Sequence, residues 1–195
     1  MIYFLLIILS YTIGSIPFGY LVGKYIKGID IRQHGSGNIG ASNAFRVLGA
    51  KLALLVLLGD CIKGFICIYL SRMIGVELFN YYLLIGMSVI LGHNWSIFLK
   101  FKGGKGIATT YGVVLAIYPF IAICAAIIWG IIVWISKIPS LGSLISIFFM
   151  IIMSLVLKKP FSFILFGLSI FLLAMIRHRK NIARLINKEE NRINF

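Results

Sequence analysis

Residues 107–135 read IATTYGVVLAIYPFIAICAAIIWGIIVWI, an apolar run of 29 residues. One transmembrane helix needs about 20 apolar residues, so this run is too long for a single crossing. It also contains Pro119, and proline breaks a helix because it lacks the amide N–H and clashes with the preceding turn. The stretch therefore predicts two membrane helices that meet at Pro119.

Five further apolar runs surround this stretch. They cover residues 2–22, 52–70, 78–99, 138–157 and 161–176. Hydrophobic residues make up 61% of the 195-residue chain, and the mean hydropathy is +1.03. Together these features predict an all-α, polytopic integral membrane protein with seven transmembrane helices. We expect one membrane-embedded domain over the whole chain, because no polar stretch is long enough to bury its own core.

The net charge of +14 comes from 19 lysines and arginines, which lie mainly between the apolar runs. The basic segments 24–51, 100–105 and 177–192 are typical of cytoplasmic loops. They predict an external N-terminus, a cytoplasmic C-terminus and anionic membrane lipid as a partner. Nucleic acid is excluded as a partner because the chain has no groove-reading motif or aromatic platform, and no obligate protein partner is indicated.

A glycine-rich segment, GSGNIGASNAFRVLG at residues 35–49, follows the first apolar run. Three glycines within six residues permit a tightly turned backbone whose consecutive N–H groups could converge on an oxyanion. Ser36 and Asn38 add side-chain donors. The alternative is a flexible connector without a ligand.

The second half of this segment predicts a short helix that ends near Gly49. Ser42 is the expected N-cap, because its hydroxyl can accept from a backbone N–H of the first turn. Such a helix places Asn43 and Arg46 one turn apart on the same face. A cation and an amide at this spacing favour anion binding over a simple connector.

A second glycine-rich segment, KFKGGKGIAT at residues 100–109, precedes the 107–135 run. Its glycines are expected to expose backbone N–H groups, Lys102 and Lys105 supply positive charge, and the N-terminus of the following helix favours an anion. Phosphate is the expected ligand of this segment. The segment is not a Walker A loop, because Gly106 follows the lysine where that motif has Ser or Thr. The alternative is three lysines that only mark a cytoplasmic loop.

The basic tail begins with RHRKNIARL at residues 177–185. If the last apolar helix continues here, His178 and Asn181 share one face at i and i+3, and Arg177, Asn181 and Arg184 share one at i, i+4 and i+7. The helix would then present an imidazole, an amide and a guanidinium toward the loops. Arginines that reach lipid phosphates are the alternative explanation.

Two polar features lie inside apolar runs. Asp60 and Lys63 are three residues apart, so they share a helix face and can partly neutralise each other. His93 is more typical of a hydrogen-bonded structural histidine than of a catalyst.

The remaining polar residues exclude several chemistries. The three histidines and five carboxylates show no metal-ligand spacing, and no cofactor motif occurs. Cys61, Cys67 and Cys124 lack the paired spacing of redox or metal sites and are expected in the core. No nucleophile motif is present, so an enzyme of this sequence has only His93 or His178 as an obvious base at neutral pH.

Four segments together resemble the bacterial membrane acyl-phosphate:glycerol-3-phosphate acyltransferases, in the order and spacing of that family. They are GSGNIGASNAFRVLG, DCIKG at residues 60–64, GHNWSIFLKFKGGKGIAT at residues 92–109, and RHRKNIARL. The resemblance spans almost the whole chain. It implies a seven-helix fold in the bacterial plasma membrane with its active site facing the cytoplasm. It also implies acyl transfer from acyl phosphate to the 1-hydroxyl of glycerol 3-phosphate, which gives lysophosphatidic acid and phosphate.

The resemblance also implies roles for particular residues around the two phosphorylated substrates. The expected catalytic residues are Ser36, Arg46, Lys105, His178 and Asn181. The expected substrate-binding residues are Asn38, Asn43, Lys102, Gly103, Gly104, Gly106 and Thr109. Two positions depart from the family pattern: Ser42 replaces a usual threonine, and Lys188 stands where glycine is common.

A transporter for a phosphorylated metabolite is the competing class, because basic glycine-rich loops and a broken helix also occur in substrate pathways. The chain shows no inverted repeats, and its polar residues gather toward one side rather than at the midplane. The acyltransferase interpretation is therefore the stronger one.

Overall fold

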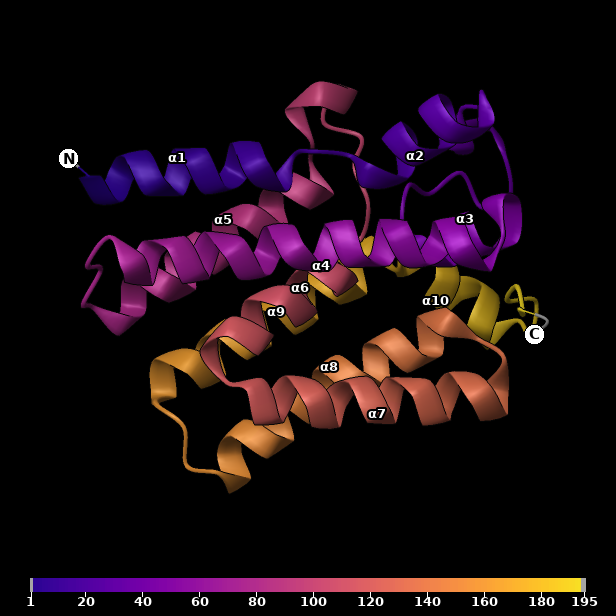
Figure 1. Cartoon of the computed structure of the whole chain (residues 1–195). Helices are drawn as coiled ribbons and strands as arrows, with labels where there is room; N and C mark the ends of the chain where they lie inside the picture. Colours follow the sequence, from indigo (N-terminus) through magenta and orange to yellow (C-terminus); the bar gives the residue numbers. More distant parts are fainter. Residues whose placement is uncertain (1, 194–195) are drawn as a thin grey trace. The chain divides into compact units, whose positions relative to one another are not determined.

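The computed structural model describes residues 2–193, which form helices joined by loops (Figure 1). The chain divides into two compact units, Met1–Ile117 and Tyr118–Phe195. Helix α6 (Ile107–Ile117) ends the first unit, and α7 (Pro119–Ser136) begins the second with its proline in the first turn. The predicted break at Pro119 is confirmed, since proline is well tolerated where a helix begins.

The first unit is a helical bundle with polar loops. Its helices before α6 are α1 (Ile2–Gly14), α2 (Phe18–Lys27), η1 (Ile31–Gln33), α3 (Ala41–Leu48), α4 (Ala50–Met73), α5 (Phe79–Asn94) and η2 (Ile97–Leu99). The first apolar run is interrupted between α1 and α2, where Pro17 precedes the second helix. Helix α4 packs along α6 and α3, and α5 packs along α1. The bundle thereby holds both glycine-rich loops on one scaffold.

Backbone contact joins α4 to α6. A Cβ added to Gly64 would lie 2.3 Å from the carbonyl oxygen of Thr109. A Cβ added to Gly112 would lie 1.9 Å from the carbonyl oxygen of Cys61. Small residues at such crossings allow membrane helices to approach closely, which fixes the position of α6 against α4.

The second unit contains α7, α8 (Pro139–Val156), α9 (Phe161–Arg177) and α10 (Arg179–Ile186). Helix α8 packs against both α7 and α9. The prediction that the last helix continues through the tail is wrong, because α9 and α10 meet at His178 with a bend of 67°. The bend turns Asn181 and Arg184 toward Glu190, a residue nine positions after Asn181. Arg177 therefore does not share a helix face with them.

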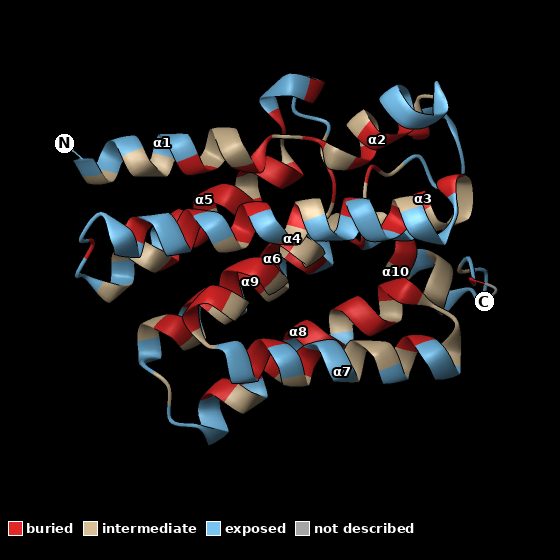
Figure 2. Cartoon of the chain, in the orientation of Figure 1, coloured by how far each residue is buried: buried red, intermediate tan, exposed pale blue. Residues whose placement is uncertain are grey.

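The exposed surface of the long helices is apolar. Figure 2 shows exposed residues along α4 and α7, and they include Leu54, Leu58 and Trp134, which are 54%, 48% and 71% exposed. Such faces suit lipid rather than water. Among residues 2–193, five helical segments are long and apolar enough to cross a membrane, or six if the bent α9–α10 pair counts as one span. The predicted all-helical, polytopic membrane protein is thus confirmed.

Candidate active site

The loop between α2 and α3 is organised by the side chain of Asn43. Its Oδ1 accepts from the backbone N–H of Ser36 at 2.8 Å, and its Nδ2 donates to the carbonyl oxygens of Asn38 at 2.8 Å and His34 at 3.1 Å. Asn43 is only 1% exposed. A loop held by a buried amide is a defined structure, so Asn43 shapes the site, while its contact with a substrate stays a prediction.

The backbone of this loop differs from the predicted anion nest. Gly37 lies in the left-handed region, with φ of 72°, as the glycine spacing predicted. However, the N–H of Gly37 donates to the carbonyl of His34, and the N–H of Gly40 donates to Oδ1 of Asn38 at 2.8 Å. The N–H of Ser36 is taken by Asn43. These three N–H groups are satisfied within the loop, so the expectation that they converge on an oxyanion is wrong.

Helix α3 starts one residue before the predicted cap. Gly40 is its N-cap and makes no side-chain cap bond, so Ser42 lies inside the helix and its prediction as N-cap is wrong. The hydrogen bond between Gly40 and Asn38 already turns the chain there, which leaves no role for a capping hydroxyl. The helix ends at Leu48, and the predicted end near Gly49 is confirmed. Arg46 lies in its last turn.

The second glycine-rich loop is built on the end of α5. The N–H of Gly104 donates to the carbonyl oxygen of His93 at 2.9 Å, so its expected exposure toward an anion is wrong. Gly106 has φ of 79°, which a side chain would strain, and it lies against the side chain of Asn94. Lys102 is exposed and Lys105 is half-buried. The positive charge of the loop thus comes from its lysine side chains, and contacts with His93 and Asn94 hold its backbone in place.

Thr109 lies in the first turn of α6, and the residue is 0% exposed. Its hydroxyl has no hydrogen-bond partner. A buried hydroxyl without a partner is unfavourable by about 1–3 kcal/mol. Asn94 is likewise 0% exposed, and neither atom of its amide is paired. The first turn of α6 and the end of α5 therefore carry buried polar groups that a polar ligand could satisfy.

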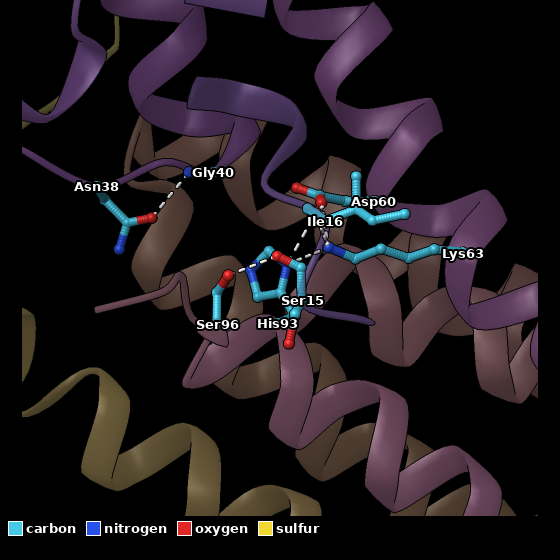
Figure 3. Close-up of polar contacts among 8 residues, drawn as sticks. All are labelled: Ser15, Ile16, Asn38, Gly40, Asp60, Lys63, His93 and Ser96. Atoms are coloured by element: carbon cyan, nitrogen blue, oxygen red, sulfur yellow. Dashed lines mark hydrogen bonds and ion pairs between the residues drawn. The ribbon is translucent and has the colours of Figure 1, made fainter. Parts of the chain in front are cut away.

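A buried ionic cluster joins α4 to the end of α5 (Figure 3). Nζ of Lys63 is 2.8 Å from Oδ1 of Asp60, and both side chains are 2% exposed. The predicted neutralisation of this pair within the bundle is confirmed. Nδ1 of His93 lies 2.9 Å from Nζ of Lys63 and 3.3 Å from Oδ1 of Asp60. His93 thus belongs to the cluster, although its sequence position gave no sign of these partners.

In the second unit, His178 occupies the bend between α9 and α10 and is 2% exposed. Its Nδ1 lies 2.9 Å from the carbonyl oxygen of Ala174. A carbonyl oxygen can only accept, so this contact assigns the proton of the ring to Nδ1. In the neutral ring, Nε2 is then the acceptor nitrogen.

Glu190 connects the tail to α8, and the sequence did not reveal this role. Its Oε1 accepts from Nδ2 of Asn181 at 2.5 Å and from Oγ of Ser140 at 2.8 Å, and its Oε2 accepts from Nε of Arg184 at 2.7 Å. Burial disfavours the charged carboxylate, but these three hydrogen bonds outweigh burial and hold the pKa of Glu190 below its ordinary value. The bonds also fix the orientation of the Asn181 amide. Glu190 lies too far along the chain for helical spacing to indicate the contact.

The predicted site residues thus fall in two groups. Ser36, Asn38, Asn43, Arg46, Lys102, Gly103, Gly104, Lys105, Gly106 and Thr109 belong to the first unit, and His178 and Asn181 belong to the second. Among residues 2–193, no group of three or more metal-binding side chains occurs.

The structure and the site define a class: a helical, multi-pass membrane protein whose polar residues gather in two ordered glycine-rich loops and a bent basic tail. The sequence profile of the glycerol-3-phosphate acyltransferase family matches residues 4–188. The glycerol-3-phosphate acyltransferase of Bacillus subtilis (strain 168) is 43% identical over 191 residues, which cover 98% of this chain and 97% of that protein. The one of Desulforudis audaxviator is 42% identical, with 98% and 96% covered.

Two solved structures share the fold. One is the crystal structure of PlsY (YgiH), an integral membrane glycerol 3-phosphate acyltransferase, in its glycerol 3-phosphate form. It is 36% identical, with a TM-score of 0.92 over 100% of this chain and 96% of that one. The other is the lysophosphatidic acid form of the same enzyme, with a TM-score of 0.90 and the same coverage and identity.

This chain belongs to the glycerol-3-phosphate acyltransferase family. The resemblance drawn from its four motifs is confirmed, and the chain is an enzyme of phospholipid synthesis rather than a transporter.

Proposed function

We propose that the enzyme transfers a fatty acyl group from acyl phosphate to the 1-hydroxyl of sn-glycerol 3-phosphate, giving lysophosphatidic acid and phosphate. The main support is the 36% identity, over the whole chain, to an enzyme solved in glycerol 3-phosphate and lysophosphatidic acid forms. The proposal also specifies acyl phosphate as the acyl donor. Its support is the second basic glycine-rich loop, which suits a second phosphorylated substrate.

The whole chain forms one catalytic domain in this proposal. Arg46 and Lys105 bind phosphate oxygens through charge-assisted hydrogen bonds, and the hydroxyl of Ser36 and the amide of Asn181 orient the reacting groups. Asn38, Asn43, Lys102 and Thr109 complete the binding of the substrates, and Gly103, Gly104 and Gly106 allow the backbone of the loop to approach them. No metal ion or cofactor enters the reaction.

The acyl chain lies between helices in the membrane. Each buried CH₂ contributes about 0.8 kcal/mol, so a long chain holds the donor while the phosphate fixes its reactive carbonyl at the interface. The exposed apolar faces of the helices are compatible with this arrangement.

The chemical step is one displacement at the acyl carbon. The 1-hydroxyl oxygen of glycerol 3-phosphate forms the new C–O bond, the bond between the acyl carbon and the donor phosphate breaks, and phosphate leaves with the electron pair. We assign the hydroxyl proton to the substrate's own phosphate, whose second pKa is about 6. His178 is the alternative acceptor, since Nδ1 carries its ring proton and Nε2 is the basic nitrogen.

The pH dependence of kcat/KM distinguishes these two acceptors. A phosphonate analogue of glycerol 3-phosphate has a higher second pKa than the natural substrate. If the substrate is the base, the acid limb of the profile moves to higher pH with the analogue. An unmoved acid limb would assign the proton to His178 instead.

The function is tested with purified protein and palmitoyl phosphate. Phosphate release is measured with and without glycerol 3-phosphate, beside Lys105→Ala and the control Lys51→Ala, whose exposed lysine lies outside both loops. We expect release that depends on glycerol 3-phosphate, with lysophosphatidic acid as product, and its loss only in Lys105→Ala. Efficient turnover of palmitoyl-CoA or palmitoyl-acyl carrier protein by the same preparation would contradict acyl phosphate as the direct donor.

We also propose seven crossings, with the N-terminus outside and the active site and C-terminus in the cytoplasm. Within the first unit, Oγ of Ser96 donates to the carbonyl of Ser15, which supports one common side for the two glycine-rich loops. Within the second unit, the N–H of Ile193 donates to the carbonyl of Lys137, which supports one side for the tail and the α7–α8 turn. Helix α6 has 11 residues and is about 17 Å long, so it crosses only part of a 30 Å hydrocarbon core by itself.

The topology is tested by cysteine accessibility in intact cells, on a background without the three native cysteines. A membrane-impermeant maleimide is expected to label Glu77→Cys and Lys158→Cys. Lys51→Cys and Lys188→Cys are expected to react only after lysis. Labelling of Lys188→Cys in intact cells would contradict the cytoplasmic tail.

A further inference from the structure

The ionic cluster of Asp60, Lys63 and His93 has no part in the reaction described above. Its side chains are 2%, 2% and 4% exposed, and they lie on α4 and α5, two of the segments that can span a membrane. Charged groups in such a place are unfavourable unless they are paired, and they are usually functional. The contacts of the cluster indicate what it does.

The ammonium group of Lys63 has three donors and three close acceptors. They are Oδ1 of Asp60 at 2.8 Å, the carbonyl oxygen of Ile16 at 2.9 Å and Nδ1 of His93 at 2.9 Å (Figure 3). A lysine ammonium can only donate, so Nδ1 of His93 accepts and the ring carries its proton on Nε2. A doubly protonated ring would put two cations 2.9 Å apart. The shorter contact, with the ammonium, therefore favours the neutral Nε2–H tautomer of His93, the opposite of His178, over donation from Nδ1 to Oδ1 of Asp60 at 3.3 Å.

The other edge of the His93 ring faces the second glycine-rich loop. A Cβ added to Gly104 would lie 2.1 Å from Nε2, 2.9 Å from Cε1 and 3.0 Å from Cδ2 of this ring. The N–H of Gly104 also donates to the carbonyl oxygen of His93. Gly104, the residue directly before Lys105, thus contacts both the backbone and the ring of His93.

We infer that His93 is a positioning residue, whose ring is oriented by Lys63 and Asp60 and supports the Gly103–Gly104 backbone so that Lys105 is held in place for the substrate phosphate. The inference deepens the proposed function and rests on it only for the role of Lys105. Lys63 also bonds to the carbonyl of Ile16, so the same cluster ties α4 to the break between α1 and α2.

The contacts at Gly104 and Gly103 allow a matched test. At Gly104, the three heavy atoms nearest to an added Cβ all belong to the His93 ring, so truncating the ring removes the closest contacts. At Gly103, an added Cβ meets the backbone carbonyl of His93 at 2.0 Å and the backbone of Asn94, which truncation leaves in place. Gly104→Ala and Gly103→Ala are therefore each made alone and together with His93→Ala.

The readouts are kcat/KM for glycerol 3-phosphate and the thermal midpoint in detergent. Gly104→Ala is expected to lower kcat/KM by about tenfold in the wild-type background and by less than about threefold in the His93→Ala background. The effects of substitutions at two contacting residues are not additive. Gly103→Ala is expected to have the same effect in both backgrounds. Equal effects of Gly104→Ala in the two backgrounds would overturn the inference.

Histidine-selective ¹⁵N NMR tests the ring without any variant in the loop. The chain has three histidines, so His34→Gln and His178→Gln assign the spectrum. We expect the signature of an Nε2–H tautomer for His93, and its loss in Lys63→Met but not in Lys51→Met. An Nδ1–H or doubly protonated His93 at neutral pH would overturn the inference. These results do not depend on turnover, so they can fail or succeed separately from the proposed acyl transfer.

Discussion

Nδ2 of Asn181 lies 2.5 Å from Oε1 of Glu190, so a residue with a predicted catalytic role is oriented by a carboxylate nine positions further along the chain. Glu190→Gln preserves size but removes the charge that Asn181, Arg184 and Ser140 share. We expect it to lower the free energy of unfolding by about 1–3 kcal/mol and to reduce activity. Thermal denaturation in detergent and kcat measure these effects. The exposed neighbour Glu189 supplies the control, and an equal loss in Glu189→Gln would contradict the role of Glu190.

The stability of the tail is expected to depend on pH through Glu190. Three hydrogen bonds outweigh the unfavourable burial of its carboxylate, so its pKa in the folded protein is lowered. The ionised group therefore stabilises the folded state above the unfolded pKa of about 4.3, and this contribution is lost as the pH falls through the folded pKa. The difference in thermal midpoint between wild type and Glu190→Gln should be constant above about pH 5 and shrink below it. A difference that does not change with pH would refute this assignment.

Thr109→Val tests the unpaired hydroxyl at the start of α6. Valine has nearly the same shape, so the substitution removes an unsatisfied buried group and is expected to stabilise the substrate-free protein by about 1 kcal/mol. Because the proposed substrate satisfies the hydroxyl, KM is expected to rise. Thermal midpoints and steady-state kinetics measure both effects. Thr12→Val is the control, since that hydroxyl donates to the carbonyl of Ile8, and it should not stabilise the protein.

Gly64→Ala is expected to destabilise the first unit by about 1–3 kcal/mol or more, because the new methyl group would meet the carbonyl oxygen of Thr109. Separation of α4 from α6 also moves the loop that carries Lys105, so activity should fall with stability. Gly130→Ala in α7 is the matched control, because nothing lies within 4 Å of its added Cβ. It should be neutral or stabilising by up to about 1 kcal/mol. Similar losses at both positions would contradict the packing argument.

Those parts of the structure that depend on local pattern could be predicted from sequence. Pro119 predicted the break between α6 and α7, because proline acts within one turn of its own position. Asp60 and Lys63 could be paired because three residues bring side chains to one helix face. Four motifs at family spacing were enough to identify the family.

Parts that depend on distant contacts could not be predicted. The bend at His178 turns Asn181 toward Glu190, and neither residue indicates this partner by periodicity. The N–H groups of the first loop looked suited to an anion, yet the loop itself uses three of them, which depends on where the Asn43 side chain folds back. Lys188 adopts φ of 59°, in the left-handed region that favours glycine, and the expectation that this position suits glycine agrees with its backbone.

The contacts at Gly64 and Gly112 also bear on motion during turnover. Each glycine meets a backbone carbonyl of the facing helix, so no rotamer change can loosen the contact between α4 and α6. We therefore expect the two helices to move together. Entry of the acyl donor and departure of the lipid product are then expected to use displacements of other helices or of the loops.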